Sequence, residues 1–179
     1  MIRLTLLAGL LAGAALAADP LPTVPPSCDL TAVAPWTSAG EGYRVQAMTD
    51  GDDCAGASLS LALVSPHGRA LWERSYGATT AVRRFYGVPG PSDMQNELDA
   101  WIAPADGKPA VSTDLPVWDD EAPAPDGFEP VEPFTTVTWA ALRAAARPLF
   151  CFDDAPGYQT CVALGADDAV TEIGRRATR

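Results

Sequence analysis

The stretch SLSLALV-SPHGR-ALWERSY, residues 58–76, decides the fold of this 179-residue chain. Its outer segments, residues 58–64 and 70–76, alternate in side-chain character with a period of two, which predicts two β-strands. Pro66 presets the backbone of the turn between them and Gly68 closes that turn, so we expect an antiparallel hairpin. Each strand should present large side chains on one face: Leu59, Leu61 and Leu63 on the first, and Trp72, Arg74 and Tyr76 on the second.

Further strands are predicted in both halves of the chain, by alternation or by short apolar runs between turn residues. The first half turns at the polar residues 49–53, and the second half turns at residues 153–157. The expected strands are residues 42–48 and 82–86 in the first half, and residues 149–152, 158–164 and 169–173 in the second.

Two amphipathic helices are predicted between these strand regions. The first begins near Ser92, because Ser92 and Gln95 match a capping box at the start of an apolar stripe. The second covers residues 138–146 and ends before Pro148. Antiparallel β-meanders from both halves, covered by two short helices, place the chain in the α+β class. The side chains expected to face inward are Met94, Leu98, Trp101 and Ile102 on the first helix, and Trp139 and Leu142 on the second.

The first 17 residues predict a secretory signal peptide. Arg3 supplies the positive charge, an apolar run follows it, and Ala15-Leu16-Ala17 is a small-x-small cleavage site. The apolar run is shorter than the roughly 20 residues that a membrane-spanning helix needs. We therefore expect cleavage after Ala17, an extended arm over residues 18–27 and a single globular domain over residues 28–179. The expected location is the periplasm of a Gram-negative bacterium, or the medium outside the cell.

Export determines how the four cysteines are interpreted. An even number of cysteines in an oxidising compartment predicts a disulfide framework, and four cysteines allow three pairings. We favour Cys28–Cys54 and Cys151–Cys161, because each pair brackets a local unit. A redox or nucleophilic cysteine is not favoured, because the chain has no C-x-x-C pair and His67 is its only histidine.

The charge balance restricts the classes of partner. The formal net charge is −11, and loss of the signal peptide with Arg3 makes it −12. Nucleic acids and anionic membranes are bound through Lys and Arg, so neither is an expected partner. A basic protein or peptide is the partner class that this charge favours.

The candidate binding site lies in the segment between the two predicted helices, residues 103–134. Its seven prolines largely exclude regular structure, and its part from Asp114 to Glu132 has seven acidic residues and no basic one. Long connections of this kind are usually functional or mobile. Because aromatic residues are interspersed, we expect the segment to lie against the domain. The candidate binding residues are Trp118, Asp119, Asp120, Glu121 and Asp126.

No catalytic, metal or cofactor motif is predicted from the sequence. His67 has no orienting third group that would make it a catalytic base for the nearby Ser65. The DGDD sequence at residues 50–53 begins like a calcium loop, but Cys54 and Leu61 occupy the fifth and twelfth positions, where oxygen ligands are required. Phosphate-loop, dinucleotide-binding, nucleophile-elbow and zincin motifs do not occur.

Three functional hypotheses remain at the level of the sequence. The first is a non-enzymatic exported binding module for a basic partner, for example a cationic cell-wall hydrolase. The second is a hydrolase that uses the loop carboxylates, with or without a divalent cation, because glycosidase chemistry needs a pair of carboxyl groups. The third is a structural protein of the envelope without a discrete site. The absence of a catalytic motif favours the first.

Overall fold

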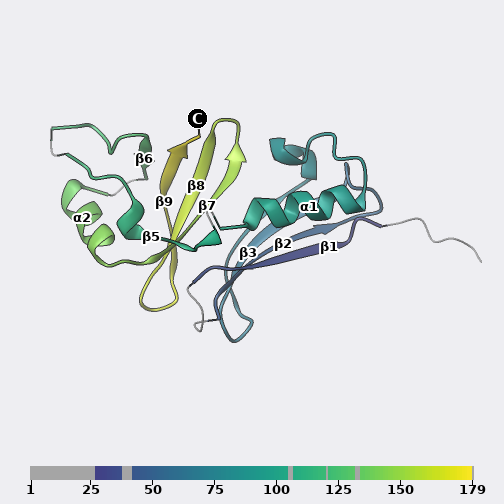
Figure 1. Cartoon of the computed structure of the whole chain (residues 1–179), viewed down its shortest axis with the longest axis horizontal. Helices are drawn as coiled ribbons and strands as arrows, with labels where there is room; N and C mark the ends of the chain where they lie inside the picture. Colours follow the sequence, from purple (N-terminus) through teal and green to yellow (C-terminus); the bar gives the residue numbers. More distant parts are fainter. Residues whose placement is uncertain (1–26, 38–41, 105–106, 120, 132–133, 179) are drawn as a thin grey trace, which may run out of the picture.

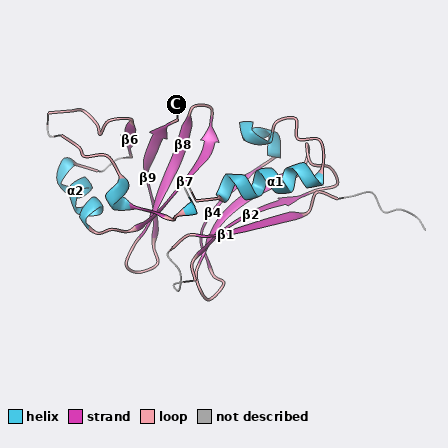
Figure 2. Cartoon of the chain, viewed as in Figure 1, coloured by secondary structure: helices cyan, strands magenta, loops and turns pink. Residues whose placement is uncertain are grey.

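The computed structural model describes residues 27–37, 42–104, 107–119, 121–131 and 134–178. These residues form two antiparallel sheets and two α-helices, which confirms the predicted α+β class (Figures 1 and 2). The predicted signal peptide and nearly all of the predicted arm lie outside the described residues. None of the helices among the described residues is long and apolar enough to cross a membrane.

The first sheet is a four-stranded meander in which every strand pairs with its neighbour in the chain. The predicted hairpin is confirmed with its expected bounds, and it pairs Leu63 with Trp72 and Leu61 with Arg74. Helix α1 (Pro91–Ile102) lies across one face of this sheet (Figure 1). The strands are β1 (Leu30–Pro35), β2 (Arg44–Asp50), β3 (Ser58–Val64) and β4 (Ala70–Tyr76).

The strand predicted over residues 82–86 is wrong, because this segment forms short 3₁₀ turns. They are η1 (Thr79–Ala81) and η2 (Arg83–Phe85). Val82 and Phe85 are both buried, and the Phe85 N–H donates to the Val82 carbonyl at 3.0 Å. Two apolar residues three positions apart suit a 3₁₀ turn, in which such side chains lie on the same side.

The capping box predicted for α1 is also wrong. Gly90 occupies the N-cap position and no side chain caps it, while Pro91 takes the first position of the helix. Proline suits that position, since its fixed φ is helical and its missing N–H has no intrahelical acceptor there. The second helix, α2 (Thr136–Ala144), starts two residues earlier than predicted. The Thr135 and Thr138 side chains cap it by bonding to each other's backbone N–H.

The second sheet has five strands in the order β5-β7-β8-β9-β6. Its centre is the predicted C-terminal hairpin with its third strand, while its two short edge strands come from the segment that we expected to be largely irregular. This segment also contains η4 (Ser112–Asp114). The strands are β5 (Ala110–Val111), β6 (Phe128–Pro130), β7 (Pro148–Ala155), β8 (Tyr158–Leu164) and β9 (Val170–Ala177).

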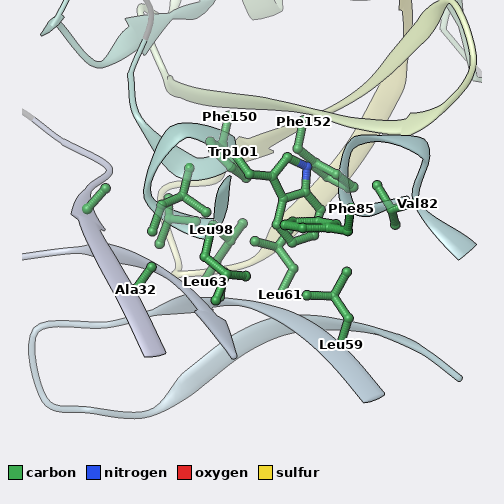
Figure 3. Packing of buried hydrophobic residues seen from close by; sticks show 14 of the residues in the cluster. Ala32, Leu59, Leu61, Leu63, Val82, Phe85, Leu98, Trp101, Phe150 and Phe152 are labelled. Atoms are coloured by element: carbon green, nitrogen blue, oxygen red, sulfur yellow. The ribbon is translucent and has the colours of Figure 1, made fainter. Parts of the chain in front are cut away.

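The two faces of the second sheet contribute to two different cores. One face packs with α1 and the first sheet, where Trp101 makes edge contacts with Phe85 and Phe152 at ring-centroid distances of 5.2 and 6.2 Å (Figure 3). The other face packs against α2 and the acidic segment around Trp139, which is fully buried. Alternate residues of β7 therefore enter opposite cores, Phe150 and Phe152 the first and Leu149 and Cys151 the second.

Both predicted disulfides are present. Cys28–Cys54 ties the residues before β1 to the turn after β2, and Cys151–Cys161 joins two residues that lie directly opposite each other on β7 and β8. An ion-pair network also links the two sheets. The guanidinium of Arg74 on β4 donates to Asp154 on β7 and Glu172 on β9, each at 2.7 Å, and lies over the ring of Trp72.

Candidate functional site

The predicted anchor of the binding site, Trp118, packs into the second core. Its ring makes an edge contact with Trp139 at 6.1 Å, and its indole N–H donates to the Ala122 carbonyl at 3.0 Å. Phe128 and Phe134 contact Trp139 as well, at 5.0 and 5.8 Å. The rings of the acidic segment therefore cover the second face of the five-stranded sheet, which confirms that the segment lies against the domain.

The acidic candidates of this segment lie on its outside. Asp119 accepts the Glu121 N–H on its carboxylate at 3.0 Å, so its side chain shapes the local turn. Glu121 and Asp126 are exposed. Asp120 lies outside the described residues. The structure thus gathers aromatic rings beneath this segment and leaves its described carboxylates directed to solvent or to the segment itself.

The other residues weighed from the sequence are turn residues in the structure. Ser65 is buried and its hydroxyl accepts the Arg69 N–H at 3.1 Å, while His67 is exposed at the tip of the turn. Asp53 accepts the Gly56 N–H at 2.8 Å. No group of three or more potential metal-ligating side chains occurs in the part of the chain that the structure describes.

A second acidic surface emerges on the four-stranded sheet, on the face opposite α1. The inner face of this sheet is buried, whereas the residues that point outward from β1, β2 and β4 are largely exposed. This outer face contains a shallow groove of about 490 Å³. Carboxylates and hydroxyls line it together with Leu30 and Met48. These polar residues are Asp29, Asp50 and Glu73, and Thr31, Thr49, Ser58, Ser60 and Ser75.

The strand register explains the shape of this outer groove. Thr31, Met48, Ser60 and Ser75 are successive cross-strand neighbours and form one row across all four strands. Three of the four side chains in this row are short and carry a hydroxyl, so the row forms the bottom of the groove. The carboxylates lie beside the row.

The charged side chains that line the outer groove are all acidic. No basic residue lines it among those described, and the exposed Asp52 and Asp53 in the adjoining turn add two further negative charges. The Gly51 N–H donates to Asp29 at 2.9 Å, and this bond, followed by contacts with Ser27 and Asp50, holds the pKa of Asp29 below its usual value. Asp29 therefore stays ionised at neutral and mildly acidic pH. This surface suits a cationic group.

No protein-family model, no curated protein and no solved structure matches this chain.

Sequence reasoning missed the outer groove because its residues come from four strands and the turns between them. Asp29, Asp50 and Glu73 are spread over 45 positions, and only the register of the meander brings them to one surface. One usable signal exists in the sequence. The first two outward positions of residues 58–64 are Ser58 and Ser60, so the polar start of this face was readable from the alternation itself.

Proposed function

We propose that this protein is an exported interaction module that binds a basic protein or peptide on the outer face of its four-stranded sheet. The observation that carries the proposal is the outer groove, which three carboxylates and no base line among the described residues, on a sheet face that no described helix covers. Charge complementarity of this kind mainly sets the association rate and the choice of partner.

Export rests on the predicted signal peptide, and it is supported by the two disulfides, which persist in oxidising compartments. The periplasm is the location we propose. The groove is preferred to the acidic segment as the binding surface, because Trp118 is already in contact with the second core and so is less available as an anchor for a partner.

Two charge-matched triple variants test the proposal. The first is Asp29→Asn, Asp50→Asn and Glu73→Gln in the outer groove, and the second is Glu121→Gln, Asp126→Asn and Glu129→Gln in the acidic segment. Both remove three negative charges, so they differ only in place. The probes are a synthetic oligolysine peptide and a cationic lysozyme, with affinity measured by calorimetry at low and physiological salt.

The groove variant should weaken binding about tenfold at low salt and reduce its salt dependence, because it removes the carboxylates nearest to the partner. The segment variant should bind within about twofold of wild type. Equal weakening by both variants would mean that net charge alone governs binding. A larger loss in the segment variant would transfer the site to residues 114–131.

A further inference from the structure

A second concave site lies on a different part of the molecule, where η2, α1 and the turn between β7 and β8 meet. It is a cleft of about 630 Å³, within the range of small-molecule sites. Four charged side chains line it, together with accessible apolar surface from Ala155 and Pro156. They are Arg83 and Arg84 from η2, Glu97 from α1 and Asp153 from β7.

The charged groups of this cleft are arranged as adjacent donors and acceptors. Arg84 donates to Glu97 at 3.2 Å and lies 3.5 Å from Asp153. Gln159 donates to the other oxygen of Asp153 at 2.9 Å and so fixes that carboxylate from behind. Because Arg84, Glu97 and Asp153 are each held by a neighbour, this part of the cleft is organised before any ligand arrives, and this lowers the entropic cost of binding.

The balance of charge excludes most ligand classes. Two guanidinium groups face two carboxylates, so the cleft has no net charge with which to select an anion or a cation. Its polar lining does not suit a purely apolar ligand. Yet hydrogen-bonding capacity remains. The second Glu97 oxygen and the exposed Arg83 have no hydrogen bond to another side chain in the described residues, and the buried Nε–H of Arg84 has no acceptor there.

From these features we infer that the cleft binds a neutral oligosaccharide. Neighbouring hydroxyls of a sugar ring need a donor and an acceptor side by side, which the guanidinium and carboxylate pairs provide. The apolar C–H face of a pyranose ring matches the accessible surface of Ala155 and Pro156. This site does not depend on the outer groove, which lies on another face of the first sheet.

Titrations of the full mature protein, followed by amide chemical shifts, test the inference with matched pairs of probes. Chitotriose is compared with its cationic deacetylated trimer, and galactotriose with anionic trigalacturonate. At least one neutral trisaccharide should bind, at least fivefold tighter than its charged counterpart, with the largest shifts at Glu97, Asp153 and Gly157. The inference is overturned if a charged trimer binds more tightly, or if neither neutral trimer binds at millimolar concentration.

Two variants locate the site. Glu97→Gln and Arg83→Met should each weaken the neutral trisaccharide about tenfold, the usual cost of losing one charge-assisted hydrogen bond. Arg83 is exposed, so its variant is expected to fold even if changes near Arg84 disturb packing. Glu73→Gln, in the outer groove, is the control and should leave sugar binding unchanged. Unchanged binding in both cleft variants would place the sugar elsewhere and refute the assignment.

Discussion

Replacement of Gly174 by alanine tests how the short strand β6 closes the edge of the five-stranded sheet. Gly174 lies in β9 opposite Pro130 and has a φ of 146°, a conformation that side chains rarely adopt. A Cβ atom at this position would lie 2.5 Å from Cε1 of Phe128 and 2.8 Å from Cα of Pro130, and it would also collide with the carbonyl oxygen of Glu129. Two of these three atoms belong to the backbone of β6, so rotation of a side chain cannot relieve the contact.

The cost follows from two separate terms. Forcing a methyl group into a filled space typically costs about 1–3 kcal/mol. The unfavourable backbone conformation adds about 1–2 kcal/mol for a residue with a side chain. We therefore expect Gly174→Ala to lower the free energy of unfolding by about 3 kcal/mol, which corresponds to roughly 6–12 °C in Tm for a chain of this size.

Two further glycines separate these terms in urea unfolding experiments. Gly157 has a φ of 81° but open space around it, so Gly157→Ala should cost only the backbone term, about 1 kcal/mol. Gly77 has neither a positive φ nor a neighbour within 4 Å, and Gly77→Ala should be neutral or stabilise by up to about 1 kcal/mol. If Gly174→Ala is no more harmful than Gly157→Ala, then β6 does not approach β9 as closely as described.

Three more predictions concern the links between elements. By loop-closure entropy, removing the Cys28–Cys54 disulfide, which spans 26 positions, should cost about 3.5 kcal/mol of stability, and removing Cys151–Cys161, which spans 10, about 2.7 kcal/mol. Denaturant unfolding of the two double alanine variants should reproduce this order, and the reverse order would count against the entropic account. Arg74→Ala leaves the buried carboxylate of Asp154 without its ion-pair partner and should lower the free energy of unfolding by about 3 kcal/mol. Arg69→Ala breaks an exposed ion pair and should change the free energy of unfolding by less than about 1 kcal/mol. Equal losses in the two variants would show that the Arg74 ion pair is solvated. Burial, with the charge of a nearby carboxylate, raises the pKa of Tyr76 to about 12, so its contribution to stability should be complete below pH 10 and be lost as the pH rises through 12. Absorbance titration should show one tyrosine that ionises at higher pH than the others, and Tyr76→Phe should remove it. Ionisation of Tyr76 together with the exposed tyrosines would contradict this prediction.

Local signals predicted the parts of this fold whose side chains alternate and whose turns carry Pro or Gly. The β3–β4 hairpin has the predicted bounds because the alternating leucines and the Pro66–Gly68 turn specify the same register. Strand β1 was missed because its six residues include Pro35 and few large apolar side chains, and it is held in place by pairing with β2. At residues 82–86, strong strand formers were overridden by the contacts of Val82 and Phe85 with the first core.

Gly174 is another position where a prediction from local sequence was overridden by a tertiary contact. A glycine followed by Arg175 and Arg176 suggested the end of a strand, yet β9 continues to Ala177. The reason is tertiary, since the missing side chain lets β6 approach closely. The sequence near Gly174 does not indicate that the backbone of β6 packs against it.

The assignment of the binding site to the first sheet follows from how the second sheet is buried. The run Leu149-Phe150-Cys151-Phe152 has no polar alternation, which is typical of a strand covered on both faces. Such a strand requires a second covering layer, and α2 alone is too short to provide it. The aromatic residues of the acidic segment supply the remainder of that layer, so they are explained by packing around Trp139. The first sheet differs, because β2 alternates and no described element covers the serines, threonines and carboxylates that line the groove on its outer face. The acidic groove on this face is not needed to complete either core, and for this reason we assign partner binding to it.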